Sequence, residues 1–139
     1  MTQEEKSLLL KDLCARLAYR NTKCYNRNTE EDFTLSDVSD TDTDCPIFDY
    51  GYCDIEYIQP YLRPMESMTN EERLELSRLT DDKFKFYLYT NKPEIICYEK
   101  YNYLEGLKVL DWLNSHHFDY RGLIEKSLAL PAKENIYND

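Results

Sequence analysis

Glycine is scarce in this sequence, which has three glycines among its 139 residues. A loop that cradles phosphate groups depends on several glycines at fixed spacing, so this scarcity nearly excludes a phosphate-binding loop. Neither the G-x-S-x-G motif of hydrolases nor the H-E-x-x-H motif of metalloproteases occurs. The two histidines stand together at His116 and His117, and nothing in the sequence places a cysteine nucleophile beside them. No motif therefore indicates an enzyme class.

Long apolar runs and paired cysteine motifs are also missing. No stretch approaches the roughly 18 apolar residues of a membrane span, and the first residues lack the basic segment and apolar run of a secretory signal. The five cysteines are an odd number and form no C-x-x-C pair, which favours free thiols in a reducing compartment. We therefore expect a cytoplasmic protein that contacts no membrane and needs no metal or other cofactor.

Basic residues are missing from one long stretch of the chain. Between Asn28 and Leu62 there is no lysine or arginine, and the formal net charge of −10 arises entirely in this quarter of the sequence. An acidic surface formed by this stretch would repel the phosphates of nucleic acids and attract a basic protein. The alternative is that the stretch forms solvated acidic loops without a binding role. The ten acids of this acidic run are Glu30, Glu31, Asp32, Asp37, Asp40, Asp42, Asp44, Asp49, Asp54 and Glu56.

Part of the acidic run resembles half of a calcium-binding loop. Residues 40–44 read D-x-D-x-D, but Cys45 and Gly51 stand where a calcium loop needs a glycine and a bidentate glutamate. An acidic turn fits better than a metal site. Since tyrosine rings serve as anchors in protein interfaces, we expect an interaction face with three aspartates and three tyrosines. These residues are Asp40, Asp42, Asp44, Tyr50, Tyr52 and Tyr57.

Helical periodicity marks three segments within one expected domain over residues 1–139, whose tail frays from about Pro131. The capping-box pattern T-x-x-E at Thr2 predicts a helix over residues 3–18, and the same pattern at Thr69 predicts a short helix over residues 70–79. A third helix is expected over residues 102–117. Its core-facing apolar stripe would be Tyr103, Leu107, Leu110 and Leu113.

Alternation of apolar and polar residues indicates strands elsewhere. Residues 19–58 contain short apolar clusters separated by turn residues, which predict three or four strands in a meander. Residues 84–89 (FKFYLY) should form a strand, with residues 94–99 as its hairpin partner. We therefore expect an α+β fold with an N-terminal helix, a small and mostly antiparallel sheet or open barrel, and a C-terminal helix packed on it.

The stretch WLNSHHFDYRGLI, residues 112–124, is the main candidate for a small-molecule site. Adjacent helical residues point about 100° apart, so the two histidines cannot easily share a metal ion, and near a helix end they can simply satisfy the last carbonyls. Arg121 can clamp a carboxylate or phosphate, or it can form a salt bridge that pins the last segment to the body. The candidate binding residues are His116, Asp119, Tyr120 and Arg121.

Three segments of the chain keep their order and cover roughly a third of it: SLLLKDLCARLAY at 7–19, IQPYLRPMESMTNEE at 58–72 and DWLNSHHFDYRGLIEKSLAL at 111–130. Together they resemble a family of small uncharacterised proteins encoded by gut anaerobic bacteria and by their phages and prophages. Members of that family tend to have proline where this chain has Ala18 and glycine where it has Ser127. The resemblance implies a cytosolic accessory protein of a mobile element or its host, and it implies no particular activity.

Two hypotheses about function follow from these features. The first is a non-enzymatic protein-binding or regulatory module that acts through its acidic, tyrosine-rich face, one form of which is a phage-derived antagonist of a host enzyme. The second is a small-molecule-binding protein or enzyme with its site around the HHFDYRG segment. The sequence leaves the partner, the ligand and the oligomeric state open.

Overall fold

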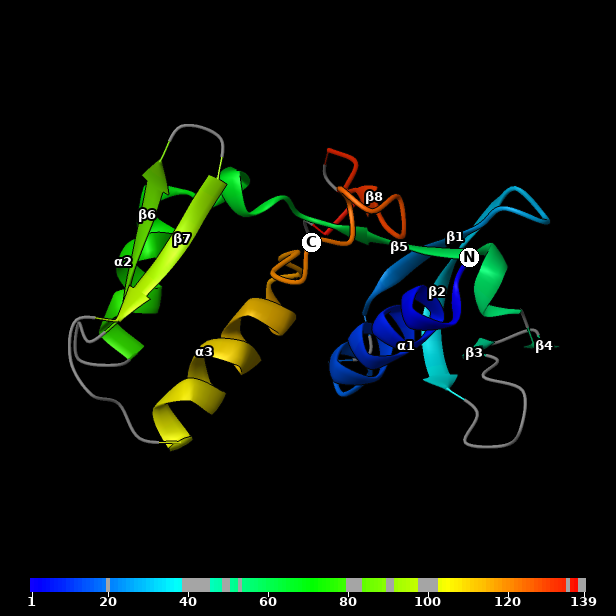
Figure 1. Ribbon diagram of the computed structural model, residues 1–139, viewed down its shortest axis with the longest axis horizontal. Coiled ribbons are helices and arrows are strands. Elements are labelled where there is room, and N and C mark those ends of the chain that lie inside the picture. The colour runs from blue at the N-terminus through cyan, green and yellow to red at the C-terminus, as the bar shows by residue number, and fades with distance from the viewer. Residues whose placement is uncertain are drawn as a thin grey trace. The chain divides into compact units, whose positions relative to one another are not determined.

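The computed structural model describes residues 1–19, 21–38, 46–48, 51–52, 54–79, 84–89, 92–97, 103–134 and 136–137 (Figure 1). Its internal contacts group into two compact units. The first unit consists of Met1–Leu62 together with Arg121–Asp139, and the second consists of Arg63–Tyr120. The chain therefore leaves the first unit after Leu62 and returns to it at Arg121. The single domain expected from chain length stays a prediction.

The N-terminal helix of the first unit, α1, spans Gln3–Leu17. The Thr2 hydroxyl accepts a hydrogen bond from the Glu5 backbone N–H at 3.1 Å, and the Thr2 backbone N–H donates to the Glu5 carboxylate at 2.9 Å. These bonds satisfy N–H groups that have no partner within the helix, so they fix the residue at which it begins. The helix predicted over residues 3–18 is confirmed.

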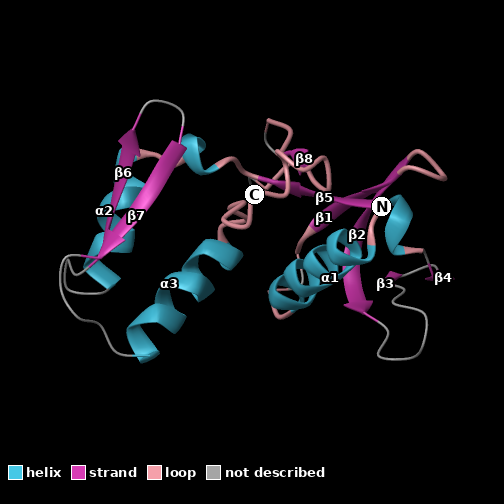
Figure 2. Ribbon diagram, viewed as in Figure 1, coloured by secondary structure: helices cyan, strands magenta, loops and turns pink. Residues whose placement is uncertain are grey.

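An open six-stranded sheet lies in the first unit, in the order β4-β3-β2-β1-β5-β8 (Figure 2). All neighbouring strands are antiparallel except β5 and β8, which are parallel. Strands β1 to β4 pair in succession, as the predicted meander requires, and the α+β class with a mostly antiparallel open sheet is confirmed. The strands are β1 Lys23–Asn26, β2 Glu31–Val38, β3 Pro46–Phe48, β4 Gly51–Tyr52, β5 Ile58–Leu62 and β8 Leu130–Pro131, with the 3₁₀ helix η1 Ile55–Tyr57 before β5.

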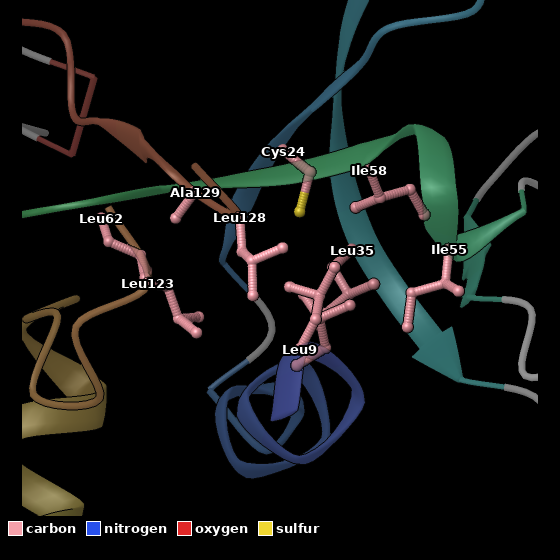
Figure 3. Close-up of a cluster of buried hydrophobic side chains, with 10 residues drawn as sticks. Leu9, Cys24, Leu35, Ile55, Ile58, Leu62, Leu123, Leu128 and Ala129 are labelled. Atoms are coloured by element: carbon pink, nitrogen blue, oxygen red, sulfur yellow. The ribbon is translucent and has the colours of Figure 1, made fainter. Parts of the chain in front are cut away.

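Helix α1 packs against this sheet through its leucines. Leu9 and Leu13 are fully buried among apolar residues of β1, β2 and β5 and of the C-terminal segment. Figure 3 shows Leu9 on α1 pointing toward this cluster. Each leucine removed from water in this way contributes on the order of 2–3 kcal/mol. Residues near the C-terminus therefore complete a core that begins with α1. The cluster comprises Leu9, Leu13, Cys24, Leu35, Ile55, Ile58, Leu62, Leu123, Leu128 and Ala129.

The polar tail is bonded to the sheet as far as Tyr137, in place of the fraying expected from about Pro131. The Tyr137 hydroxyl donates to the Tyr61 carbonyl at 2.6 Å and accepts a hydrogen bond from the Lys23 backbone N–H at 3.0 Å. Burial raises the pKa of Tyr137 well above its usual value, because a charged phenolate is poorly solvated there. Polar composition suggested fraying, but a single half-buried tyrosine holds the described tail in place.

The described part of the second unit contains two helices and a separate β-hairpin. In chain order its elements are the 3₁₀ helix η2 Met65–Ser67, α2 Asn70–Leu79, β6 Phe84–Tyr89, β7 Lys92–Cys97 and α3 Tyr103–Ser115. Strands β6 and β7 pair with each other as an antiparallel two-stranded sheet. The predicted short helix and the strand FKFYLY are confirmed, and the hairpin partner begins two residues earlier than expected.

Helix α3 buries a different face from the predicted one. Leu107 and Leu110 of the predicted stripe are 37% and 43% exposed, although Leu113 is buried as expected. The sequence of α3 carries two overlapping apolar stripes, and packing within the second unit selects the one that contains Trp112. This helix, which we expected to lie on the sheet, thus contributes to a core in its own unit. That core comprises Met68, Leu76, Val109, Trp112, Leu113 and Phe118.

Candidate functional site

Helix α3 ends in a Schellman motif, in which two backbone N–H groups reach back to carbonyls of the last turn. The His117 N–H donates to the Asn114 carbonyl at 3.1 Å, and the Phe118 N–H donates to the Leu113 carbonyl at 3.0 Å. The motif needs a left-handed residue, usually glycine, at the position of His117, whose φ is 64°. The helix therefore ends at Ser115, two residues before its predicted end, and both histidines lie in the turn that follows.

The His116 side chain caps the helix end. Its imidazole stacks on the indole of Trp112, with ring centroids 4.1 Å apart and planes inclined by 21°. Its Nδ1 lies 2.9 Å from the Trp112 carbonyl oxygen and 3.1 Å from the Ser115 hydroxyl. Because a carbonyl can only accept, we assign a proton to Nδ1, which donates to this oxygen. His116 therefore adds a side-chain bond to a carbonyl of the last turn of α3, which also accepts the His116 backbone N–H at 3.1 Å and the Ser115 hydroxyl at 2.9 Å.

His117 and Asp119 are held in place by their backbones. Both residues are buried, with exposed fractions of 4% and 8%. The Arg63 N–H donates to the His117 carbonyl at 2.7 Å, and the Asp119 N–H donates to the Arg63 carbonyl at 2.9 Å. This short parallel bridge ties the chain after α3 to the segment that leads into α2. The candidate residue Asp119 and its neighbour His117 are thus positioned by strand-like pairing with a segment far away in sequence.

A column of stacked groups extends from His116 to Arg63 within the second unit. Trp112 stacks on Phe118 as well as on His116, with centroids 5.7 Å apart and planes inclined by 12°. The guanidinium carbon of Arg63 lies 4.2 Å from the centre of the Phe118 ring. Arg63 also binds the Glu72 carboxylate through two hydrogen bonds of 2.7 Å. Cation–π and ion-pair contacts thereby connect the end of α3 to the first turn of α2.

Sequence reasoning missed the pairing of Arg63 with Glu72. Burial alone would raise the pKa of Glu72, but hydrogen bonds from Arg63 and from the Thr69 backbone N–H lower it to about 2. The Thr69 bond belongs to the predicted capping box, which the structure confirms with bonds of 3.0 and 3.1 Å. The two charged residues lie nine positions apart, a spacing that no helical or strand periodicity connects. The one sequence feature that could have drawn attention to Arg63 is its position beside Pro64, directly after the acidic run.

Tyr120 and Arg121, the last two candidate residues, belong to different units. The Tyr120 hydroxyl donates to the Asn114 side-chain oxygen at 2.9 Å in the second unit. In the first unit, Arg121 Nη1 lies 3.0 Å from Oδ1 of Asp12. Asp12 also accepts hydrogen bonds from Arg16 Nε and Nη2 at 2.8 and 3.0 Å, and both of these α1 residues are fully buried. The Arg121 contact agrees with the salt-bridge alternative, in which this residue pins the C-terminal segment to the body.

Most of the predicted interaction face lies outside the described residues. These residues are Asp40, Asp42, Asp44 and Tyr50, and the description of Tyr52 is limited to its place in β4. Tyr57, at the end of η1, is described and is 41% exposed. A ring that is exposed beside acidic residues is available to a partner.

Some acids of the run are paired within the first unit. Lys6 binds Glu56 at 2.8 Å and lowers its pKa through this hydrogen bond. The Tyr61 hydroxyl and Lys133 Nζ bind Asp32 at 2.7 and 2.9 Å, and these bonds lower the pKa of Asp32. Both lysines come from outside the acidic run. The bases of the first unit therefore neutralise part of the acidic excess, and both carboxylates stay ionised at neutral pH.

No family model matches the chain, and neither does any curated protein or solved structure. The site is accordingly defined by its own contacts. Among the residues that the structure describes, no helix is long and apolar enough to cross a membrane. In the same part of the chain, no three His, Cys, Asp or Glu side chains are grouped so that they could hold a metal ion.

Proposed function

We propose that this chain is a non-enzymatic protein-binding or regulatory protein that acts in the cytoplasm through its acidic, tyrosine-rich face. The observation that carries the proposal is the acidic run, which contains ten acids and no lysine or arginine between Asn28 and Leu62. The exposed ring of Tyr57 supports it, since aromatic rings next to charged residues are common anchors of interfaces. Tyr50 and Tyr52 are the other proposed anchors.

The partner is a protein with a basic surface. A concentrated negative potential accelerates the encounter with a positive surface and disfavours approach to nucleic-acid phosphates. One specific form of the proposal is an antagonist, encoded by a phage or prophage, of a host enzyme that binds nucleic acid. In that form the spaced carboxylates of the acidic run occupy the place of a phosphate backbone. The resemblance to proteins of gut bacteria and their phages supports this context.

The small-molecule alternative receives less support from the contacts at the HHFDYRG segment. His116 Nδ1 binds a helix carbonyl, the Tyr120 hydroxyl binds Asn114 and Arg121 binds Asp12. Each of these bonds stabilises the fold without any ligand. We therefore do not assign a reaction to these residues.

A charge-neutralising variant tests the proposal directly. A partner captured from the host is purified, and its affinity is measured by titration calorimetry at about 50 mM and about 300 mM salt. Affinity should fall at least about tenfold over this range, because screening weakens attraction between opposite charges. Replacing Asp40, Asp42 and Asp44 by asparagine should weaken binding at low salt and flatten the salt dependence.

The matched control removes the same charge from the second unit. Glu66, Glu71 and Glu75 are exposed, so replacing them by glutamine changes the net charge equally without touching the acidic run. Binding should stay within about twofold of the unmodified chain. Salt-insensitive binding, or an equal loss in both variants, would contradict the proposal.

A further inference from the structure

The β6–β7 hairpin forms a sheet of its own among the described strands. Its two strands pair over six residues each, and no third strand of the described chain joins them. Figure 1 shows the two strands side by side, with α2, which contacts β6, behind them. An isolated two-stranded sheet is marginally stable in water, and here α2 packs on β6, while the outer strand edges can still form hydrogen bonds with a further strand. The question is which of its two edges can accept one.

A proline in β7 determines which backbone groups point away from the hairpin. Pro93 lies opposite Leu88 and has no N–H, so this pair cannot exchange ladder hydrogen bonds. Residue pairs along an antiparallel ladder alternate between hydrogen-bonded and non-hydrogen-bonded pairs. Every second pair counted from Leu88 and Pro93 is therefore also non-hydrogen-bonded. On β6, Phe84, Phe86 and Leu88 therefore direct their N–H and C=O groups away from β7.

The two edges of the hairpin consequently differ. The outer edge of β7 lacks one donor at Pro93, a common device that protects an edge strand from further pairing. The outer edge of β6 retains a donor and an acceptor at each of three alternate residues. Its sequence, FKFYLY, contains no proline, glycine or acid, and its residues favour strands. Only the β6 edge therefore offers an uninterrupted template for another strand.

We propose that a second copy of this chain pairs with β6 along this edge, antiparallel and with a two-fold axis at Phe86. In this register Phe84 of one copy lies opposite Leu88 of the other. The residues whose N–H and C=O groups point away from β7 then lie opposite each other in the two copies. Three donors from each copy give about six hydrogen bonds across the interface. Phe86 is central among these residues, so this register gives the longest overlap. The result is a continuous four-stranded sheet in the order β7-β6-β6-β7.

Charge is compatible with this pairing. Lys85 is the one charged residue of β6, and in the proposed register it lies opposite Tyr87 of the second copy rather than opposite a second lysine. The acidic run belongs to the first unit, so none of its residues is on the pairing strand. The edge is thus self-complementary, which is the requirement for a two-fold interface. This inference is independent of the proposed acidic interaction face.

A pair of proline variants tests the proposal on the full chain. Phe86 and Ile95 lie opposite each other in one non-hydrogen-bonded pair, so proline at either position leaves the hairpin ladder intact. Phe86→Pro removes the central donor of the β6 edge, whereas Ile95→Pro removes a donor from the β7 edge. In sedimentation equilibrium, Phe86→Pro should weaken self-association at least about tenfold and Ile95→Pro less than about twofold.

A charge variant distinguishes a loss of self-association from a loss of folding. Tyr87 lies opposite Glu94 within the hairpin, so Tyr87→Lys creates an attractive pair there. In the proposed dimer the same lysine lies opposite Lys85 of the second copy, which is repulsive. Self-association should therefore weaken although the melting temperature does not fall. The proposal is overturned if the unmodified chain is monomeric at about 100 μM, or if the three variants associate equally well.

Discussion

Left-handed backbone conformations at residues other than glycine are the clearest residue-scale feature. Glu30, His117 and Ser127 have φ values of 59°, 64° and 60°. Ser127 repeats the Schellman motif of His117, since its N–H donates to the Ile124 carbonyl at 3.0 Å and the next N–H donates to the Leu123 carbonyl at 2.9 Å. An L-residue in this conformation costs roughly 1–2 kcal/mol, because its Cβ crowds the backbone. The turn before Leu128 therefore forms even though this chain has serine there.

Substitution of Ser127 by glycine should stabilise the protein. The Ser127 side chain is exposed, and the hydrogen bond from Gln59 goes to the Ser127 backbone carbonyl. Glycine therefore removes the strain and keeps this hydrogen bond. We expect the free energy of unfolding in urea to rise by about 0.5–1 kcal/mol, after allowing for the greater flexibility of unfolded glycine. Ser127→Ala keeps the strain and should give no gain. A loss of stability in Ser127→Gly would show that the left-handed turn is not strained.

Substitution of Arg121 distinguishes a structural role from a ligand-binding role. Arg121→Ala leaves Asp12 with the Arg16 contacts and should lower the free energy of unfolding by about 1 kcal/mol. Asp12→Ala leaves buried Arg16 without its carboxylate and should cost about 3–5 kcal/mol. Chemical denaturation measures both effects. If Arg121→Ala leaves stability unchanged, the contact with Asp12 does not stabilise the fold, and the ligand role considered for this residue is favoured instead.

At the scale of elements, local signals located the helices but did not decide which face of α3 is buried. The two capping boxes form as predicted because each uses groups only three residues apart. The choice between the apolar stripes of α3 depends instead on α2 and on the Met68 segment, which are distant in sequence. Leu107 and Leu110 were predicted to be buried and are exposed for this reason.

The ion pair between Glu72 and Arg63 should make stability depend on acid pH. The pKa of Glu72 is lowered from 4.5 to about 2, so its contribution is fully present above pH 4.5 and disappears as the pH falls toward 2. The stability difference between the unmodified protein and Glu72→Gln should therefore be largest near pH 6 and shrink below pH 4.5. Urea denaturation from pH 3 to pH 6 measures it, with exposed Glu71→Gln as control. A difference independent of pH would exclude this ion pair as its source.

At the scale of the whole molecule, the described residues form two hydrophobic cores, one in each compact unit. Chain length led us to expect one domain, and nothing in the sequence indicated that residues 121–139 return to the first unit after the second. Such a return places Leu123 and Leu128 beside Leu9. The one tryptophan, Trp112, lies in the second core and therefore reports on that unit alone.

A core substitution in the first unit tests whether the two units unfold separately. Leu9 is fully buried, and Leu9→Ala should destabilise its unit by about 2–5 kcal/mol. We expect the unfolding transition seen by far-UV circular dichroism to move to lower temperature, while the Trp112 fluorescence transition moves little. Leu76→Ala in the second core should have the opposite effect. Equal shifts of both signals would show that the chain unfolds as the single domain expected from its length.

The sequence by itself determined the three helices, the meander, the hairpin, the α+β class and the segregation of charge, but not strands β5 and β8. Capping boxes, apolar periodicity and runs of like charge act between residues close in the chain, so one sequence is enough to locate them. The tertiary structure decided what the candidate residues contact. Arg121 and Asp12 are 109 positions apart, and Arg63 reaches Phe118 and Glu72 only after the chain folds back. Such contacts depend on which distant surfaces pack together, and no local pattern encodes that choice.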